Sequence, residues 1–318
     1  MEATEHRPAW KTLSAFAIIY FVWGTTYLAI RVGVHEVPPF LLAAIRFLVA
    51  GGILYGWMIA KGEHSPTTRQ WMAASIVAIL IFVLDYGLLF WAEQRVPSGI
   101  AAVMMATIPT FMALLEIIFL RTQKLTVRLT MALLIGIGGV VVLVSGSLNL
   151  AGAPIDKMGA VALIIASISW SLASVLTRKV TLPPSKVMSS GAQMLAGGTF
   201  LAITAAALGE FRSFHPSTVS RETWLALLYL IVAGSIIAFT AYVWLIHHES
   251  PTKVGTYAYV NPVVAVLVGY FLGGESLGLR TILGTLFVLT SVVVITSTKA
   301  ENSTATLEVG DPAKAAES

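Results

Sequence analysis

Three ionisable side chains stand deep inside apolar stretches of the sequence, where each could bind a proton or an ion: Asp85, Glu116 and Arg46. A charged group at the centre of a bilayer costs about 2.5 to 3.5 kcal/mol on insertion scales, so such groups are functional candidates. Asp85 fits two roles. It could face a cavity, where it would carry a proton or pair with an ammonium group, or it could be a buried carboxyl with structural hydrogen bonds. For Arg46 and Glu116 structural or gating roles are favoured, because long side chains can reach an interface or a neighbouring helix.

Aromatic and amide side chains four residues apart suggest a binding surface. Trp23 and Tyr27 share one helical face, as do Trp170 and Ser174, and Tyr257 and Asn261. Apolar area with a few polar groups is typical of a small-ligand site, and ring faces can also hold ammonium groups. The predicted substrate-binding set is Trp23, Tyr27, Asp85, Tyr86, Trp170, Ser174, Tyr242, Tyr257 and Asn261. For Trp10, Trp57, Trp71 and Tyr55 a place in the interfacial aromatic belts is preferred.

Two prolines and several glycines indicate how the segments bend and pack. Pro109 and Pro262 lie inside apolar segments, where each frees a backbone carbonyl. Kinks are the favoured interpretation, and acceptors for a ligand are the alternative. "AGG" at 50–52 and 196–198 and "GIGG" at 136–139 predict close helix contacts.

Catalysis and cofactor binding are not expected. An intramembrane hydrolase would need paired aspartates, a His-Glu-x-x-His helix or a serine with an activating base, and "HHES" at 247–250 lacks metal-ligand spacing. The chain has no cysteine, so neither disulfides nor thiolate metal sites can form. Neither a repeated filter nor rings of charge are apparent, which disfavours a passive channel.

The composition is that of an integral membrane protein: 57% of residues are hydrophobic, 11% are charged and the mean hydropathy is +0.83. A span needs about 20 apolar residues, so the chain has room for about ten transmembrane helices. The predicted segments are 12–34, 38–60, 70–92, 97–120, 127–146, 158–178, 186–209, 222–246, 251–273 and 278–298. We therefore expect an all-α membrane fold.

Charge sets the expected orientation and partners. With the N-terminus in the cytoplasm, the inner ends of the segments hold 13 of the 20 Lys and Arg residues and the outer ends hold 6. The positive-inside rule then places both termini in the cytoplasm. Residues 299–318 form a polar tail that is expected to be disordered. A net charge of +4 is small for a nucleic-acid binder. The expected partners are the lipid bilayer and a small molecule, and the sequence is compatible with a monomer.

The two halves of the sequence repeat each other. "WGTTYLAIR" begins at Trp23 and "WSLASVLTR" begins at Trp170, 147 residues later, while Trp91 has a counterpart in Trp244, 153 residues later. The repeats are predicted at 12–146 and 158–298, with five helices each. Because five is odd, the second repeat enters the membrane from the opposite side. Inverted repeats around a site near the midplane are typical of secondary transporters.

The segments "WGTTYLAIRVGVHEVPPFLLAAIRFLVAG", "VPSGIAAVMMATIP" and "SPTKVGTYAYVNPVVAVLVGYFLGGESL" resemble the EamA-type permeases of the drug/metabolite transporter superfamily. The resemblance spans residues 12 to 297. It implies ten helices, cytoplasmic termini, and a central cavity between helices 1, 3, 4, 6, 8 and 9. It also implies export of amino acids or other small metabolites from bacteria, and export of lipophilic cations and drugs stays open as the alternative. The chain departs from the family where "RTQK" at 121–124 replaces a Gly-Glu pair, which the second half keeps in "GGE" at 273–275.

Overall fold

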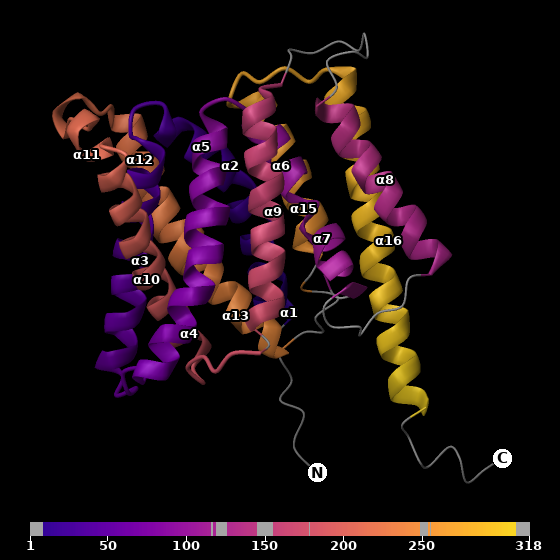
Figure 1. The fold of residues 1–318 in the computed structure, drawn as a ribbon, viewed down its shortest axis with the longest axis horizontal. Coiled ribbons are helices and arrows are strands. Elements are labelled where there is room, and N and C mark those ends of the chain that lie inside the picture. The colour runs from indigo at the N-terminus through magenta and orange to yellow at the C-terminus, as the bar shows by residue number, and fades with distance from the viewer. Residues whose placement is uncertain are drawn as a thin grey trace.

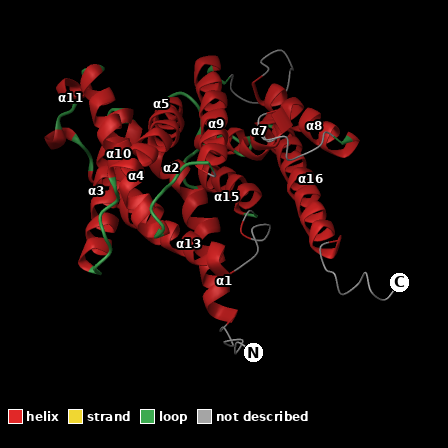
Figure 2. Cartoon of the chain, turned by 60° about the horizontal axis from the view of Figure 1, so that its bottom comes forward, coloured by secondary structure: helices red, strands yellow, loops and turns green. Residues whose placement is uncertain are grey.

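The computed structural model describes residues 9–115, 117–118, 126–144, 155–177, 179–248, 254 and 256–309, and these form helices and their connections (Figures 1 and 2). The first half holds α1 (Ala9–Ala17), η1 (Ile18–Val22), α2 (Trp23–Val34), α3 (Pro39–Ala60), α4 (Thr68–Ala78), η2 (Ile79–Gly87), α5 (Leu88–Glu93), α6 (Ser98–Met105), α7 (Ile108–Leu115) and α8 (Val127–Val144). The second half holds α9 (Lys157–Thr177), α10 (Lys186–Ala207), α11 (Glu210–Ser213), η4 (Pro216–Thr218), α12 (Arg221–Tyr229), η5 (Leu230–Ile237), α13 (Ala238–His248), α15 (Tyr257–Phe271) and α16 (Leu279–Val309).

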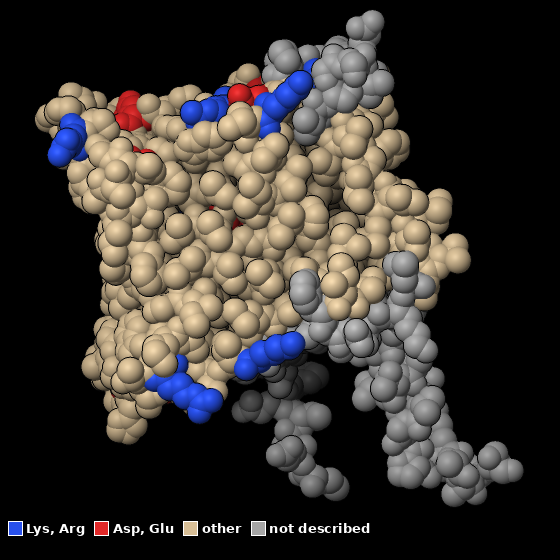
Figure 3. Space-filling view, viewed as in Figure 1, with Lys and Arg blue, Asp and Glu red and all other residues tan. Residues whose placement is uncertain are grey.

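Several of these helices have the length and composition of membrane spans. Six runs in the described part of the chain qualify: Trp10–Val34, Pro39–Ala60, Thr68–Glu93, Ser98–Leu115, Lys157–Thr177 and Arg221–Leu245. Shorter apolar helices cover Val127–Leu143, Tyr257–Phe271 and Leu279–Ile295. Charged side chains gather at the two ends of the face in Figure 3, and uncharged side chains cover most of the band between them. The fold is therefore that of an all-helical integral membrane protein.

Helical runs overlap all ten predicted segments, with three differences. The segment predicted at 97–120 is interrupted between Met105 and Ile108, and the helix predicted from 251 is described as α15 from Tyr257. The third difference is at the C-terminal end, where α16 continues to Val309 although disorder was predicted from residue 299. Extending a helix is easier than starting one, and Ala, Glu and Leu in this stretch are good helix formers.

Among the contacts that join the two halves are three antiparallel pairs of helices. Along α3 and α10, Gly51 lies against Leu195 and Gly198 lies against Leu48. Along α8 and α16, which lie side by side in Figure 1, Gly139 faces Val288. The third pair, α6 with α15, also brings a glycine close to its partner helix. These contacts confirm the packing role predicted for "AGG" and "GIGG".

Candidate functional site

One aromatic cluster is built from α2, α13 and α15. The ring centre of Trp23 lies 5.4 Å from that of Tyr242 and 5.2 Å from that of Tyr257, and the two tyrosine rings are 6.1 Å apart. Trp23 Nε1 donates a hydrogen bond to the carbonyl oxygen of Gly234 (3.1 Å), which belongs to η5. The structure thus brings together three residues predicted to bind substrate, all of them half-buried.

A second aromatic cluster surrounds Arg46 on α3. The guanidinium carbon of Arg46 lies 4.8 Å from the ring centre of Phe47, 5.4 Å from that of Tyr86 and 5.9 Å from that of Phe90. The ring of Trp170 packs edge-on against Tyr86 at 6.1 Å. Ring faces attract a cation, and the attraction grows when water is excluded. Stacking on these rings is how a charged side chain can be 2% exposed within a span.

Arg46 and Asp85 are buried ionisable side chains whose polar atoms are incompletely paired. Arg46 Nε donates to Ser235 Oγ (2.9 Å), whereas Arg46 Nη1 has no hydrogen-bond partner among the described residues. Asp85 is 1% exposed, and its Oδ1 likewise lacks a partner there. Asp85 lies within η2, a π-helical segment, and such segments are frequent at functional sites. The ring centre of Tyr86 lies 5.4 Å from the guanidinium carbon of Arg46, and Tyr86 directly follows Asp85 in the chain, so this tyrosine adjoins both groups.

Tyr27 on α2 has neighbours in both clusters. It is half-buried and within electrostatic range of Asp85, Tyr86 and Tyr257. Its hydroxyl can therefore serve as a polar contact between the two halves.

Two other predicted binding residues have polar atoms engaged by backbone. Ser174 Oγ donates to the carbonyl oxygen of Trp170 in its own helix (2.8 Å). With its amide oriented to satisfy both polar atoms, Asn261 donates to the carbonyl oxygens of Tyr20 (3.1 Å) and Ile19 (3.2 Å). Those carbonyls belong to η1, so Asn261 ties α15 to a π-helical segment.

The predicted gating residues differ in their surroundings. Pro109 is the second residue of α7, directly after the interruption, whereas Pro262 lies inside the continuous helix α15. Glu116 lies outside the described residues.

Two serines on α9, not singled out from the sequence, supply donors at the interruption. Ser167 Oγ lies 3.4 Å from the carbonyl oxygen of Met104, and Ser171 Oγ lies 3.1 Å from that of Ile108. Both hydroxyls also lie within hydrogen-bond distance of carbonyl oxygens in their own helix, Ser167 of Leu163 (2.9 Å) and Ser171 of Ser167 (2.7 Å), so the two serines connect α9 to both sides of the interruption. Their four-residue spacing on one helical face was the signal available in the sequence.

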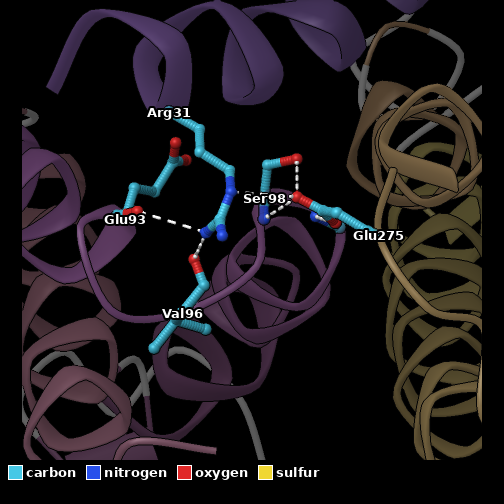
Figure 4. A network of polar contacts seen from close by, with 6 residues as sticks. Arg31, Glu93, Val96, Ser98 and Glu275 are labelled. Atoms are coloured by element: carbon cyan, nitrogen blue, oxygen red, sulfur yellow. Dashed lines mark hydrogen bonds and ion pairs between the residues drawn. The ribbon is translucent and has the colours of Figure 1, made fainter. Parts of the chain in front are cut away.

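A polar network also closes the end of the bundle away from the start of α1 and the end of α16 (Figures 1 and 4). Glu275 accepts hydrogen bonds from Ser98 N (2.6 Å), Ser98 Oγ (2.7 Å) and Gly99 N (3.0 Å) at the start of α6. Arg31 Nε lies 3.5 Å from Glu275 Oε1, and Arg31 Nη1 donates to the carbonyl oxygen of Val96 (2.7 Å). The network links the first half to the second, and none of its members was predicted from the sequence as a site residue, although Arg31 and Glu275 stand in the motifs "WGTTYLAIR" and "GGE".

Two more glutamates bind helix starts at this end. Glu36 Oε2 accepts from Ser220 N and Ser220 Oγ, both at 2.8 Å, and these hydrogen bonds lower the pKa of Glu36. Glu210 Oε2 accepts from Leu41 N (2.8 Å) at the start of α3. Burial raises the pKa of Glu210, and the backbone hydrogen bonds oppose that rise. A carboxylate at a helix N-terminus pairs with orphan N–H groups and with the helix dipole.

The comparisons with known proteins agree with this architecture. The chain matches the EamA-like transporter family over residues 10–145 and 157–297. The uncharacterized inner membrane transporter YedA of Escherichia coli is 40% identical over 284 residues, which are 89% of each chain. Protein PecM of Dickeya dadantii is 28% identical over 276 residues, 86% of this chain and 88% of PecM. A crystal structure with 23% sequence identity has a TM-score of 0.58, covers 91% of this chain and 96% of its own, and supports the fold alone.

Proposed function

Since the chain belongs to the EamA-like transporter family, we propose that it is a secondary transporter that exports small metabolites, aromatic amino acids among them, by alternating access. Membership of this family makes it a transporter and not an enzyme. The name of the relative YedA places that protein in the inner membrane. We propose the same location for this chain, with both termini in the cytoplasm.

The proposed mechanism requires two inverted repeats of five helices, 12–146 and 158–298, around a central cavity. The antiparallel pairs α3 with α10 and α8 with α16 support this arrangement, because equivalent helices of inverted repeats run in opposite directions. With 22 residues, α10 is about 33 Å long and can span the membrane despite its serines and Gln193.

The observation that supports an amino acid as substrate is that two buried ionisable side chains on packed elements, Arg46 on α3 and Asp85 on η2, each have a polar atom without a hydrogen-bond partner among the described residues. Ionising a buried carboxyl that lacks hydrogen bonds is costly, so a ligand that pairs with Asp85 and with the guanidinium of Arg46 offsets that cost and gains affinity. A zwitterionic amino acid supplies a carboxylate for the guanidinium and an ammonium group for the carboxylate. Around them, Tyr27, Tyr86 and Trp170 offer aromatic surface, while Trp23, Tyr242 and Tyr257 form the second cluster.

The alternative is export of lipophilic cations, and the aromatic cluster of Trp23, Tyr242 and Tyr257 favours it. The three rings pack against one another with centres 5.2 to 6.1 Å apart, and an ammonium group could bind against a ring face of this cluster. A cation without a carboxylate would leave the guanidinium of Arg46 unpaired and would be repelled by it. We therefore favour the zwitterion.

Counterflow of labelled phenylalanine in proteoliposomes tests this proposal. Competition by phenethylamine, which lacks the carboxylate, and by 3-phenylpropionate, which lacks the ammonium group, separates the two charge contacts. Each analogue should compete at least about tenfold less well than phenylalanine, the effect of losing roughly 1.4 kcal/mol of binding. Equal or better competition by the amine would favour the cation exporter, and flux that does not saturate would indicate a channel.

The control for this experiment is Arg46→Gln. If Arg46 binds the carboxylate, unlabelled phenylalanine and phenethylamine should compete equally well for counterflow by this variant. A variant that still discriminates between them, at unchanged amounts of folded protein, would contradict the proposed role of Arg46.

A further inference from the structure

Glu93, the last residue of α5, has a buried carboxyl group that the proposed substrate site does not use. It is 0% exposed, and among the described residues neither Oε1 nor Oε2 has a hydrogen-bond partner. A carboxylate sealed from water without donors is strongly disfavoured, whereas a protonated carboxyl is tolerated more easily. The arrangement seen here therefore favours neutral Glu93.

The charges around Glu93 come from several helices. Arg31 on α2 and Glu275, which follows α15, lie close to it (Figure 4), and Arg46 on α3 lies within electrostatic range. Tyr27 on α2 is a further titratable neighbour. At the start of α9, which packs against α5, stand Lys157 and Asp156, and Asp156 Oδ1 accepts from Gly159 N (2.6 Å).

One cation thus stands between two carboxyl groups and is paired with one of them. Arg31 Nε lies 3.5 Å from Glu275 Oε1, while Arg31 Nη1 contacts Glu93 through its backbone oxygen (3.3 Å) and not through its carboxyl group. Because the backbone of Glu93 already lies at the guanidinium, a change of the Glu93 side-chain rotamer would bring its carboxylate to Arg31.

We infer that Glu93 is a proton-binding site that controls the gate formed by Arg31, Ser98 and Glu275. While Glu93 is protonated, Arg31 stays paired with Glu275 and the gate stays closed. When Glu93 releases its proton to water at that end, its carboxylate competes with Glu275 for Arg31, and α6 separates from the segment after α15. The inference rests on alternating access as proposed above, but not on the identity of the substrate.

The repeat supports a device at one end of the molecule only. By the alignment of the two halves, Glu275 corresponds to Gln123 and Glu93 corresponds to Ile246. Both carboxyl groups are therefore replaced by side chains that do not titrate. A second gate of the same chemistry cannot be built from the equivalent positions.

Labelling of single cysteines tests the inference, because the chain has no cysteine of its own. Ala101 is 0% exposed on α6 behind the gate, whereas Ser276 is exposed beside it. Each is replaced by cysteine and labelled with a membrane-impermeant maleimide between about pH 5.5 and 8.5, where one titrating group changes a population by at most tenfold per pH unit. Dividing the Ala101→Cys rate by the Ser276→Cys rate corrects for the titration of an exposed thiol, and the ratio should rise with pH more steeply than in a variant whose residue 93 cannot titrate.

Two variants separate protonation of Glu93 from other causes. In Glu93→Gln, which stays neutral, the ratio should be low and independent of pH, while Glu93→Asp should keep a pH-dependent ratio. A ratio that rises equally in Glu93→Gln would overturn the inference. If Glu93→Gln does not fold, Glu93→Met provides another neutral side chain of similar length. Its labelling ratio must likewise be independent of pH.

The readout also separates this inference from the proposed function. Labelling needs no substrate, so a pH-dependent gate without phenylalanine counterflow would refute only the substrate proposal. Saturable counterflow together with a labelling ratio that does not depend on pH would refute only the role of Glu93.

Discussion

Gly51 on α3 offers a test of the interface between the two halves with a control next to it in sequence. A Cβ atom at Gly51 would lie 2.8 Å from Leu195 N and 3.1 Å from the carbonyl oxygen of Gly191 on α10. Backbone atoms cannot rotate away, so Gly51→Ala must push the two helices apart. A Cβ atom at Gly52 would meet nothing within 4 Å.

The difference between the two variants isolates the close contact. Both gain about 1 kcal/mol of helix propensity when glycine becomes alanine, and only Gly51→Ala adds the overpacking cost of about 1 to 3 kcal/mol. Gly51→Ala should therefore be less stable than Gly52→Ala by about 1 to 3 kcal/mol, roughly a factor of 5 to 150 in the folding equilibrium. Unfolding of the purified protein by dodecyl sulfate in mixed micelles measures the difference. Equal stability of the two variants would refute the close helix contact.

Four further predictions follow from the site and its surroundings. Trp23→Ala should reduce phenylalanine counterflow at least about tenfold by removing a stacking surface, whereas Trp57→Ala should leave it unchanged, and equal activity would remove Trp23 from the site. Asp85→Asn should abolish both counterflow and proton-driven uptake in inverted vesicles, since the ammonium group loses its partner; retained counterflow would instead make Asp85 a proton carrier, and wild-type behaviour in both assays would make it structural. Ser171→Ala should cost about 1 kcal/mol of stability by removing a donor at the helix interruption, and an unchanged unfolding midpoint would contradict this. Because the hydrogen bonds to Glu36 lower its pKa, its stabilising effect is present above its unfolded pKa and is lost as the pH falls through the lower folded value; Glu36→Gln should therefore lose less stability than the wild type on acidification, and identical acid unfolding curves would disprove this contribution.

Much of the helical framework could be predicted because the bilayer imposes a length on each segment. Segments of about 20 apolar residues with charged or Pro/Gly breaks coincide with the helical runs. The glycine contacts were also predictable, since Gly51 and Gly139 recur in small-residue runs. By contrast, an apolar run carries no signal for the π-helical turns of η2, so the local backbone around Asp85 could not be predicted.

The site was harder to predict where its contacts join distant parts of the chain. Arg46 was interpreted as structural or gating, but of the three aromatic rings around it only Phe47 is on its own helix α3, whereas Tyr86 is on η2 and Phe90 is on α5. Glu93 falls one residue beyond the predicted segment 70–92 and looks like an interfacial charge in sequence. Two of the charges near it, on Arg31 and Glu275, stand 62 residues before it and 182 residues after it in the sequence. Hydropathy along the chain contains no information on such contacts.

The glutamates at the end away from the start of α1 explain which state an exporter of this design should favour at rest. Glu36 binds the start of α12, Glu210 binds the start of α3 and Glu275 binds the start of α6, so all three connect one half of the chain to the other. Opening that end requires these carboxylates to exchange backbone N–H groups for water. Such charge-assisted contacts contribute about 1.5 to 3 kcal/mol each when shielded, and less at an exposed group such as Glu36. Since the counterpart of Glu275 in the first half is the uncharged Gln123, we expect the opposite end to open more easily. With the termini in the cytoplasm, that end faces the compartment from which an exporter takes its substrate.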